Sequence, residues 1–337
     1  MNGFKLFFVK LFNFEYWPWK YFYTPMIPYY LYLAYKNKSM VFPAHVNLNL
    51  PDGGFFNEDK ALMLEYISPK YLPKSTFFYL NKTHSNFALD YFPVVAKPLN
   101  AQRGTHVSII KSTEELEKYA NNLVADFITQ EYVQYEIELA IVYSRKPGEL
   151  KGQVSSVTQK EFLSVTGNGE NTIWQLLQKQ VRAMLIAEDI KKNTKVDLTE
   201  ILAKGQIKIV EPIGNHCRGT LFRNAAKLDF DKIAHVADII LKDFEGFHFG
   251  RFDLKVKSIV DLYAGENIKI LELNGVNADA AHIFDPNYSL FKAYGDIADH
   301  WNRLSDIALI NKKNHTFTED DLIWKKVKNK IFKSKLP

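Results

Sequence analysis

The sequence FGRFDLK at residues 249–255, followed by IKILELN at residues 268–274, carries the strongest pattern in this chain. Both segments alternate apolar and polar residues, which predicts two half-buried β-strands. On the first strand the arginine and the aspartate share one face, and on the second the glutamate and the asparagine share one face. If the two strands pair, these four polar side chains meet on one patch.

That patch contains Arg251, Asp253, Glu272 and Asn274. Carboxylate and amide oxygens suit Mg²⁺ bound to a polyphosphate, and the arginine can neutralise phosphoryl charge. The alternative is a salt-bridged surface hairpin. Carboxylates on facing strands repel each other, however, unless a cation lies between them.

The composition is typical of a soluble globular protein with two or three domains: 337 residues, 47% hydrophobic and 24% charged. The single cysteine, Cys217, cannot form an internal disulfide, which fits a reducing, cytoplasmic location. The net charge of +5 is modest. Lysines are dense only at residues 325–335, which favours a solvated tail, and no nucleic-acid motif is found, so we expect no nucleic-acid partner.

Residues 4–35 are unusually rich in aromatic side chains. Four charged residues and three prolines interrupt this segment, so it does not read as a transmembrane helix and we expect no stable membrane insertion. We expect it instead to pack on the rest of the protein or on a second subunit, as in a possible homodimer, and to shape the substrate side of a cleft.

The remaining sequence mixes strand and helix patterns, with antiparallel hairpins toward its end, which predicts an α+β fold. Strands are predicted at residues 40–47, 92–97, 107–110, 127–133, 138–143, 153–158 and 207–211. Helices are predicted at residues 25–35, 60–67, 113–123, 172–188, 231–244 and 288–309.

Two further segments carry candidate nucleotide-binding residues. Lys97 ends a predicted strand and Gly104 follows in a polar loop, an arrangement that can cradle phosphate but is also found in ordinary hairpins. Glu131 ends another strand, where backbone groups can meet the edge of an adenine. Beyond it, Glu138 can accept hydrogen bonds from ribose hydroxyls, and Glu136 competes for that role.

Taken in order, these motifs resemble the ATP-grasp superfamily, and most closely the D-alanine–D-alanine ligases and related carboxylate–amine ligases. The resemblance covers roughly residues 60–310. It implies an ATP-grasp fold, in which two α+β lobes clasp ATP. The implied domains are a short aromatic-rich N-terminal domain, a small lobe, a large lobe with the metal site, and a basic C-terminal tail, at residues 1–75, 76–133, 134–312 and 313–337.

The resemblance also implies a role for each motif. The residues implied for ATP are Lys97 at the α- and β-phosphates, Arg103, Gly104 and Thr105 in a loop that closes over the nucleotide, Glu131, Tyr132 and Val133 at adenine, and Glu138 at ribose. The implied ligands of Mg²⁺, with two ions expected and Mn²⁺ as a possible substitute, are Asp253, Glu272 and Asn274. The implied catalytic residues are Arg251 and Lys160, and the residues expected near the substrates are His216, Arg218 and His282.

Ligases of this kind make an acyl phosphate from a carboxylate and ATP, and an amine or a thiol then displaces phosphate. We therefore expect a Mg²⁺- and ATP-dependent enzyme that joins a small-molecule or peptide carboxylate to an amine. The alternatives are an ATP-grasp phosphotransferase acting on a hydroxyl and a non-catalytic ATP-binding module. In place of the Gly-rich, Glu-bearing substrate motif of D-alanine–D-alanine ligases, the chain has Asn47, Asn49 and Gly53-Gly54, so we expect a substrate other than D-alanine.

Overall fold

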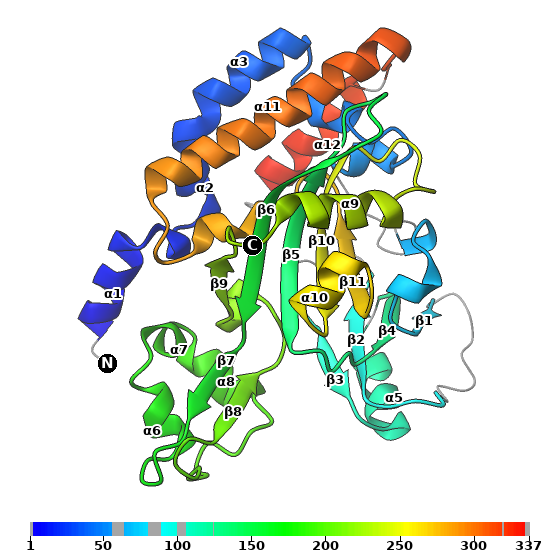
Figure 1. Ribbon diagram of the computed structural model, residues 1–337. Helices are drawn as coiled ribbons and strands as arrows, with labels where there is room; N and C mark the ends of the chain where they lie inside the picture. Colours follow the sequence, from blue (N-terminus) through cyan, green and yellow to red (C-terminus); the bar gives the residue numbers. More distant parts are fainter. Residues whose placement is uncertain are drawn as a thin grey trace.

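The computed structural model describes residues 3–55, 64–79, 89–99, 106–123, 125–318 and 320–333. Its two larger sheets are antiparallel throughout and are accompanied by helices, so the predicted α+β class is confirmed. Figure 1 shows the larger sheet at the centre of the molecule and the smaller one at the lower right.

The large sheet has the strand order β11-β10-β5-β6-β9. Its strands are β5 (Ile137–Ser144), β6 (Gln153–Glu161), β9 (Leu221–Asn224), β10 (Phe249–Val256) and β11 (Ile268–Asn274). Phe252, Leu254 and Val256 share one buried cluster with side chains of α9 (Phe230–Ile240) and α10 (Ile259–Ala264). Because side chains alternate along a strand, the polar residues of β10 lie on the opposite face.

The small sheet has the order β1-β4-β2-β3. Its strands are β1 (Ser75–Phe78), β2 (Val94–Pro98), β3 (Ser108–Ile110) and β4 (Phe127–Glu131). The helix α5 (Thr113–Asn122) begins where the sequence predicts, because the side chain of Ser112 accepts a hydrogen bond from the Glu115 N–H at 3.3 Å. Val94 and Ala96 pack with Leu116 of α5, which leaves Val95 and Lys97 on the other face.

A third, two-stranded sheet pairs β7 (Leu163–Thr166) with β8 (Ile207–Glu211). The sequence predicts one long helix at residues 172–188, and this is wrong. The chain forms three short helices there, α6 (Ile173–Leu177), α7 (Val181–Leu185) and α8 (Ala187–Asn193). The backbone is extended at Gln180, whose side-chain amide donates to the Ser164 carbonyl at 2.8 Å, so a tertiary contact overrides helix propensity.

Two other expectations are also wrong. Residues 40–47 are not a strand. They contain the 3₁₀ helix η3 (Phe42–His45), because Pro43 has no N–H to give to a sheet. The basic residues up to 333 are not a frayed tail, since α12 (Asp320–Lys333) buries Ile323 and Val327 against Val41 and Ala44. Of the helix predicted at residues 60–67, only residues 64–67 are described.

The N-terminal segment comprises α1 (Gly3–Phe12), α2 (Trp19–Tyr23) and α3 (Ile27–Asn37). Figure 1 shows α3 running beside the long helix α11 (Leu290–Asn314). Phe22, Leu33 and Ala34 share a buried cluster with α11 side chains, which confirms for α2 and α3 that this segment packs on the core. All ten residues of α1 are exposed or half-buried. No helix in the described part of the chain is long and apolar enough to cross a membrane.

Candidate functional site

Rows of polar side chains cross the face of the large sheet that lies opposite α9. The register of β10 and β11 sets Arg251 opposite Asn274 and Asp253 opposite Glu272. The pairing that the sequence predicts for these strands is therefore present, and its four polar side chains share one face. One step further along β10, Lys255 lies opposite Glu138, and Glu138 in turn lies opposite Lys160 on β6.

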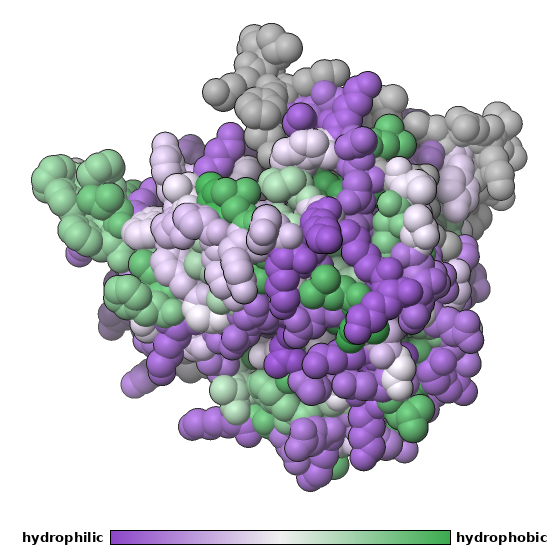
Figure 2. All heavy atoms as spheres, turned by 90° about the horizontal axis from the view of Figure 1, so that it is seen from above, coloured by the Kyte–Doolittle hydropathy of each residue, from purple (hydrophilic) through white to green (hydrophobic). Residues whose placement is uncertain are grey.

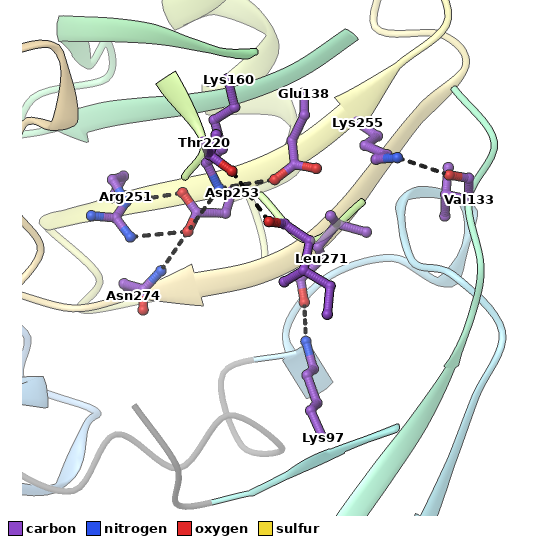
Figure 3. A network of polar contacts seen from close by, with 11 residues as sticks. Lys97, Val133, Glu138, Lys160, Thr220, Arg251, Asp253, Lys255, Leu271 and Asn274 are labelled. Atoms are coloured by element: carbon purple, nitrogen blue, oxygen red, sulfur yellow. Dashed lines mark hydrogen bonds and ion pairs between the residues drawn. The ribbon is translucent and has the colours of Figure 1, made fainter. Parts of the chain in front are cut away.

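Asp253 is the centre of the first group (Figure 3). Both of its carboxylate oxygens accept hydrogen bonds from Arg251, from Nε at 2.9 Å and from Nη2 at 2.9 Å. The Asn274 amide lies 3.5 Å from Asp253 Oδ2. Burial alone would lower the pKa of Arg251, but Asp253, Glu272 and Asp279 raise it by more, so the guanidinium stays charged.

Lys160 connects this group to the second one. Its Nζ donates to Glu138 Oε1 at 3.0 Å and lies 3.7 Å from Asp253 Oδ2. Burial opposes its charge, but the two carboxylates outweigh burial and raise the pKa of Lys160. The pKa of the nearby Lys255 is instead lowered, because burial lowers it by more than Glu138 raises it. Lys255 Nζ donates to the Val133 carbonyl at 3.1 Å.

The small sheet supplies the facing wall. Lys97, on β2, donates from Nζ to the carbonyl of Leu271 on β11 at 2.9 Å, so it joins the two sheets. Residues 131–133 continue from β4 toward β5 and also line the space between the sheets. The segment that follows β4 therefore forms part of this wall.

The two walls enclose a cavity of about 790 Å³. That volume lies within the range of small-molecule and cofactor sites. Most of the predicted site residues line it: Lys97, Glu131, Tyr132, Val133, Glu138, Lys160, His216, Arg251, Asp253, Glu272 and Asn274. The predicted loop residues Arg103, Gly104 and Thr105 lie outside the described residues.

Two of the predicted substrate residues are placed elsewhere. Arg218 does not belong to the cavity lining among the described residues, and it donates to Glu211 Oε2 at 3.0 Å and to the Val107 carbonyl at 3.1 Å. His282 is buried between Ser156, at 2.7 Å, and Asp296, at 2.9 Å. Both side chains therefore hold neighbouring segments together.

Several cavity residues were not anticipated from the sequence. Lys255 continues the alternation of Arg251 and Asp253, and that pattern could have revealed it. Gly214 approaches the site so closely that an added Cβ would lie 2.2 Å from Glu138 Oε1, which no local signal shows. Trp19 and Tyr23 line the cavity from α2, and the Tyr23 hydroxyl donates to Asp279 Oδ1 at 2.5 Å.

The donor set at Asp253 fits a hard divalent cation. Among the described residues, no group of three His, Cys, Asp or Glu side chains forms a metal site by itself. Asp253, Glu272 and Asn274 instead offer two carboxylates and one amide oxygen on adjacent strands. Such a set, completed by phosphate oxygens and water, suits Mg²⁺, which rarely occupies an all-protein cage.

No protein-family model matches the chain, and no curated protein matches its sequence. Solved structures do match. The D-alanine–D-alanine ligase from Bacillus anthracis aligns with 76% of this chain and 67% of its own, at 11% identity and a TM-score of 0.41. The VanG D-Ala:D-Ser ligase from Enterococcus faecalis aligns with 77% and 64%, at 17% identity and a TM-score of 0.40.

A bifunctional glutathione synthetase from Pasteurella multocida aligns with 72% of this chain and 36% of its own, at 15% identity and a TM-score of 0.36. All three of these structures align with more than two thirds of this chain.

Proposed function

We propose that the protein is an ATP-dependent ligase that joins a carboxylate to an amine through an acyl phosphate. The observation that carries this proposal is the single cavity in which Arg251, Asp253 and Glu272 face the strand-end lysine Lys97. Two carboxylates beside two cations suit a site that handles phosphate and a metal ion together. A mere surface hairpin would leave these groups in solvent, whereas Asp253 is only 6% exposed.

In this proposal ATP lies between the two sheets. Lys97 contacts the phosphates as a point charge. Backbone groups at Glu131 and Val133, together with the side chain of Tyr132, hold the adenine, and Glu138 accepts from the ribose hydroxyls. Lys160 Nζ donates to Glu138 Oε1 at 3.0 Å, and Lys255 lies opposite Glu138 on the neighbouring strand. The loop containing Arg103, Gly104 and Thr105 is proposed to cover the nucleotide.

Asp253, Glu272 and Asn274 would hold Mg²⁺. When bound there, the ion neutralises phosphate charge and orients the phosphoryl group. Arg251 and Lys160 lie on either side of Asp253. We propose that they neutralise the negative charge of the transferred phosphoryl group. This arrangement acts mainly by positioning and by charge neutralisation.

The proposed reaction has two steps. A carboxylate oxygen attacks the γ-phosphorus, and the bond to the bridging oxygen breaks, so that ADP leaves and an acyl phosphate forms. The amine nitrogen then attacks the carbonyl carbon. The carbon–oxygen bond to phosphate breaks, inorganic phosphate leaves, and the nitrogen loses a proton to solvent.

The substrates are proposed to enter at the Arg251 end of the cavity. Arg251 Nη1 donates to the Asp279 carbonyl at 3.1 Å, and Tyr23 holds the carboxylate of the same residue. Trp19 and Phe55 add aromatic surface to this end. His216 also lines the cavity, and it lies 3.3 Å from Glu15 of the N-terminal segment. The aromatic segment thereby bounds the region where the carboxylate and amine would meet.

Oxygen transfer from a labelled carboxylate tests the reaction. The purified protein is incubated with ATP, Mg²⁺ and mixtures of amines with ¹⁸O-labelled carboxylates, and phosphate and amide are analysed by mass spectrometry. A ligase of this kind releases phosphate that carries one ¹⁸O atom, together with an amide. A phosphorylated hydroxyl without free phosphate would identify a phosphotransferase and overturn the proposal. Unlabelled phosphate alone would indicate simple ATP hydrolysis.

A matched pair of variants tests whether the reaction takes place in this cavity. Arg251→Lys keeps the charge but loses the paired hydrogen bonds to Asp253, and we expect label transfer to fall by about 10²-fold or more. Arg303→Lys is the control, because Arg303 contacts Gln153 outside the cavity lining. Equal label transfer in both variants would exclude this site.

A further inference from the structure

The helix α1 (Gly3–Phe12) presents large apolar side chains to solvent. Phe4 and Phe12 are each 75% exposed, which is far more than an isolated surface phenylalanine needs. Phe4, Phe8 and Phe12 also contact one another in sequence, with ring centroids 4.8 Å and 6.0 Å apart. Figure 2 shows a hydrophobic projection at the left edge of the molecule, where Figure 1 places α1.

The helical period arranges these side chains in one stripe. At about 100° per residue, the exposed residues of α1 form a continuous apolar arc of roughly 140°. The members of this arc are Phe4, Phe7, Phe8, Leu11 and Phe12, all of them exposed. Leu6 and Val9 lie on the remaining side and are half-buried. The most apolar face of α1 therefore points away from the body of the protein.

Lysines border the arc on both sides. Viewed down the helix axis, Lys5 lies next to Phe12 at one border of the arc, and Lys10 lies beyond Phe7 at the other border. Both lysines are exposed. Lysine side chains at such borders can run along apolar surface and place their ammonium groups in a polar layer.

The N-terminal segment as a whole also carries more positive than negative charge. Residues 3–38 contain five lysines and a single acidic residue, Glu15. Glu15 is turned inward, where its carboxylate accepts from Arg182 Nη2 at 2.6 Å, and its side chain is only 5% exposed. The outward-facing charge of the segment is thus positive, which is complementary to an anionic surface.

We propose that α1 docks the protein on an anionic lipid surface. The phenylalanine arc would enter the boundary between headgroups and acyl chains, and Lys5 and Lys10 would meet lipid phosphates. A second copy of the chain fits less well, because the cores of protein interfaces are depleted in lysine and a second α1 would bring the same positive charge. The helix has ten residues and lies on the surface in this proposal, so it does not span the membrane.

Vesicle flotation of the full chain tests the proposal. The protein is mixed with vesicles of phosphatidylcholine alone, or of phosphatidylcholine and phosphatidylglycerol in equal parts. We expect flotation with the anionic vesicles only, and release as salt is raised, because salt screens exposed charges. The double variant Phe4→Ser/Phe8→Ser should weaken binding by about tenfold or more, and Lys5→Glu/Lys10→Glu should weaken it similarly.

The control is Leu150→Ser/Val260→Ser, which removes two exposed apolar residues, one in the loop before β6 and one in α10, and should float like the wild type. Absence of flotation for the wild type would overturn the proposal, and so would equal binding of all variants. Light scattering provides a separate check. If the wild type is a dimer and Phe4→Ser/Phe8→Ser is a monomer, α1 is a subunit contact and the lipid proposal fails. None of these readouts depends on ligase activity.

Discussion

Asp253 lies between two cations on the face of the large sheet. Arg251 occupies both of its oxygens, and the ammonium of Lys160 lies 3.7 Å from Oδ2. Removing the carboxylate takes two hydrogen bonds from Arg251 and one ion-pair partner from Lys160, and it deletes one proposed ligand of Mg²⁺. Asp253 is therefore the residue of this face at which a change of charge should affect the reaction most strongly.

We predict that Asp253→Asn lowers phosphate release by at least about 10²-fold at saturating Mg²⁺, since the amide keeps the shape but not the charge. Glu272→Gln should have an effect of the same order. Asp243→Asn is the control, because Asp243 is exposed and contacts only its neighbour Lys242 in the described network. Near wild-type turnover in both site variants would remove the metal assignment.

Lys97 lies at the junction of the large and small sheets. We predict that Lys97→Met weakens ATP binding by about tenfold or more, because one phosphate contact is lost. Calorimetry with ATP and ADP measures this, with the exposed Lys191→Met as the control. A thermal unfolding curve of each variant separates lost binding from lost sheet contact at Leu271. Unchanged affinity in Lys97→Met would contradict the phosphate role.

Among the elements, α11 connects the sheet to the N-terminal segment. It carries His300, a buried residue whose Nε2 lies 2.9 Å from Ser155 Oγ on β6. Burial, with added repulsion from His282 and Arg303, lowers the pKa of His300 to about 4. Asp296 opposes this shift but does not cancel it. The packing of α11 on β6 therefore depends on a neutral imidazole.

We predict that this histidine makes the fold sensitive to acid. In the unfolded chain a histidine binds a proton near pH ~6.5, whereas His300 does so in the folded protein only near pH 4. Between these values the unfolded chain holds more protons, so the free energy of unfolding falls as the pH falls. The full loss is about 3 kcal/mol. Denaturant unfolding across this range measures it.

The matched variants for this prediction are His300→Gln and His315→Gln. The first should reduce the slope between pH ~6.5 and pH ~4, to which His45 and His248 also contribute because burial lowers their pKa values. The second replaces an exposed histidine just after the same helix and should leave the slope unchanged. Equal slopes in the two variants would show that other groups set the acid sensitivity.

Local alternation was enough to predict β10 and β11 and the four side chains that they bring together. It succeeded because the period of two is a property of each strand alone, and the pairing follows from their closeness in sequence. The start of α5 at residue 113 was predictable because helix capping is also local. Residues 172–188 were not, because the break at Gln180 depends on a contact with Ser164 that no local pattern encodes.

The N-terminal contribution to the cavity was foreseeable only in outline. Aromatic richness predicted packing, but the position of Tyr23 depends on Asp279, which lies 256 residues further along the chain. Likewise, Pro212 and Gly214 indicate a loop, but the closeness of Gly214 to Glu138 depends on how that loop packs on the sheet. The sequence therefore predicts the strand residues of the candidate site, but not the residues that distant segments place there.

At the scale of the whole molecule, the N-terminal segment covers one side of α11. The Tyr29 hydroxyl donates to Asn302 at 2.7 Å, and Asn37 donates to Ser305 at 2.7 Å. Phe22 and Leu33 are almost completely buried in the shared cluster. Apart from α1, the segment thus belongs to the same buried cluster as α11.

We predict that deletion of residues 1–35 makes the protein aggregate, because the apolar face of α11 becomes exposed. Deletion of residues 1–12 is the matched control and should leave the protein folded, since each of the α1 side chains is exposed or half-buried. Soluble yield and size-exclusion profiles compare the two. A soluble, active protein without residues 1–35 would contradict this view of the core.

The pairing of α3 with α11 also has a consequence for synthesis on the ribosome. Asn37 and Ser305 are 268 residues apart, and Tyr29 and Asn302 are 273 apart. At about 5–20 residues per second, the early aromatic helices wait on the order of tens of seconds before their partner leaves the exit tunnel. Throughout that interval their phenylalanines and tyrosines have no native surface to cover them. We therefore expect the nascent chain to bind chaperones that recognise aromatic segments, long before β10 and β11 have been made.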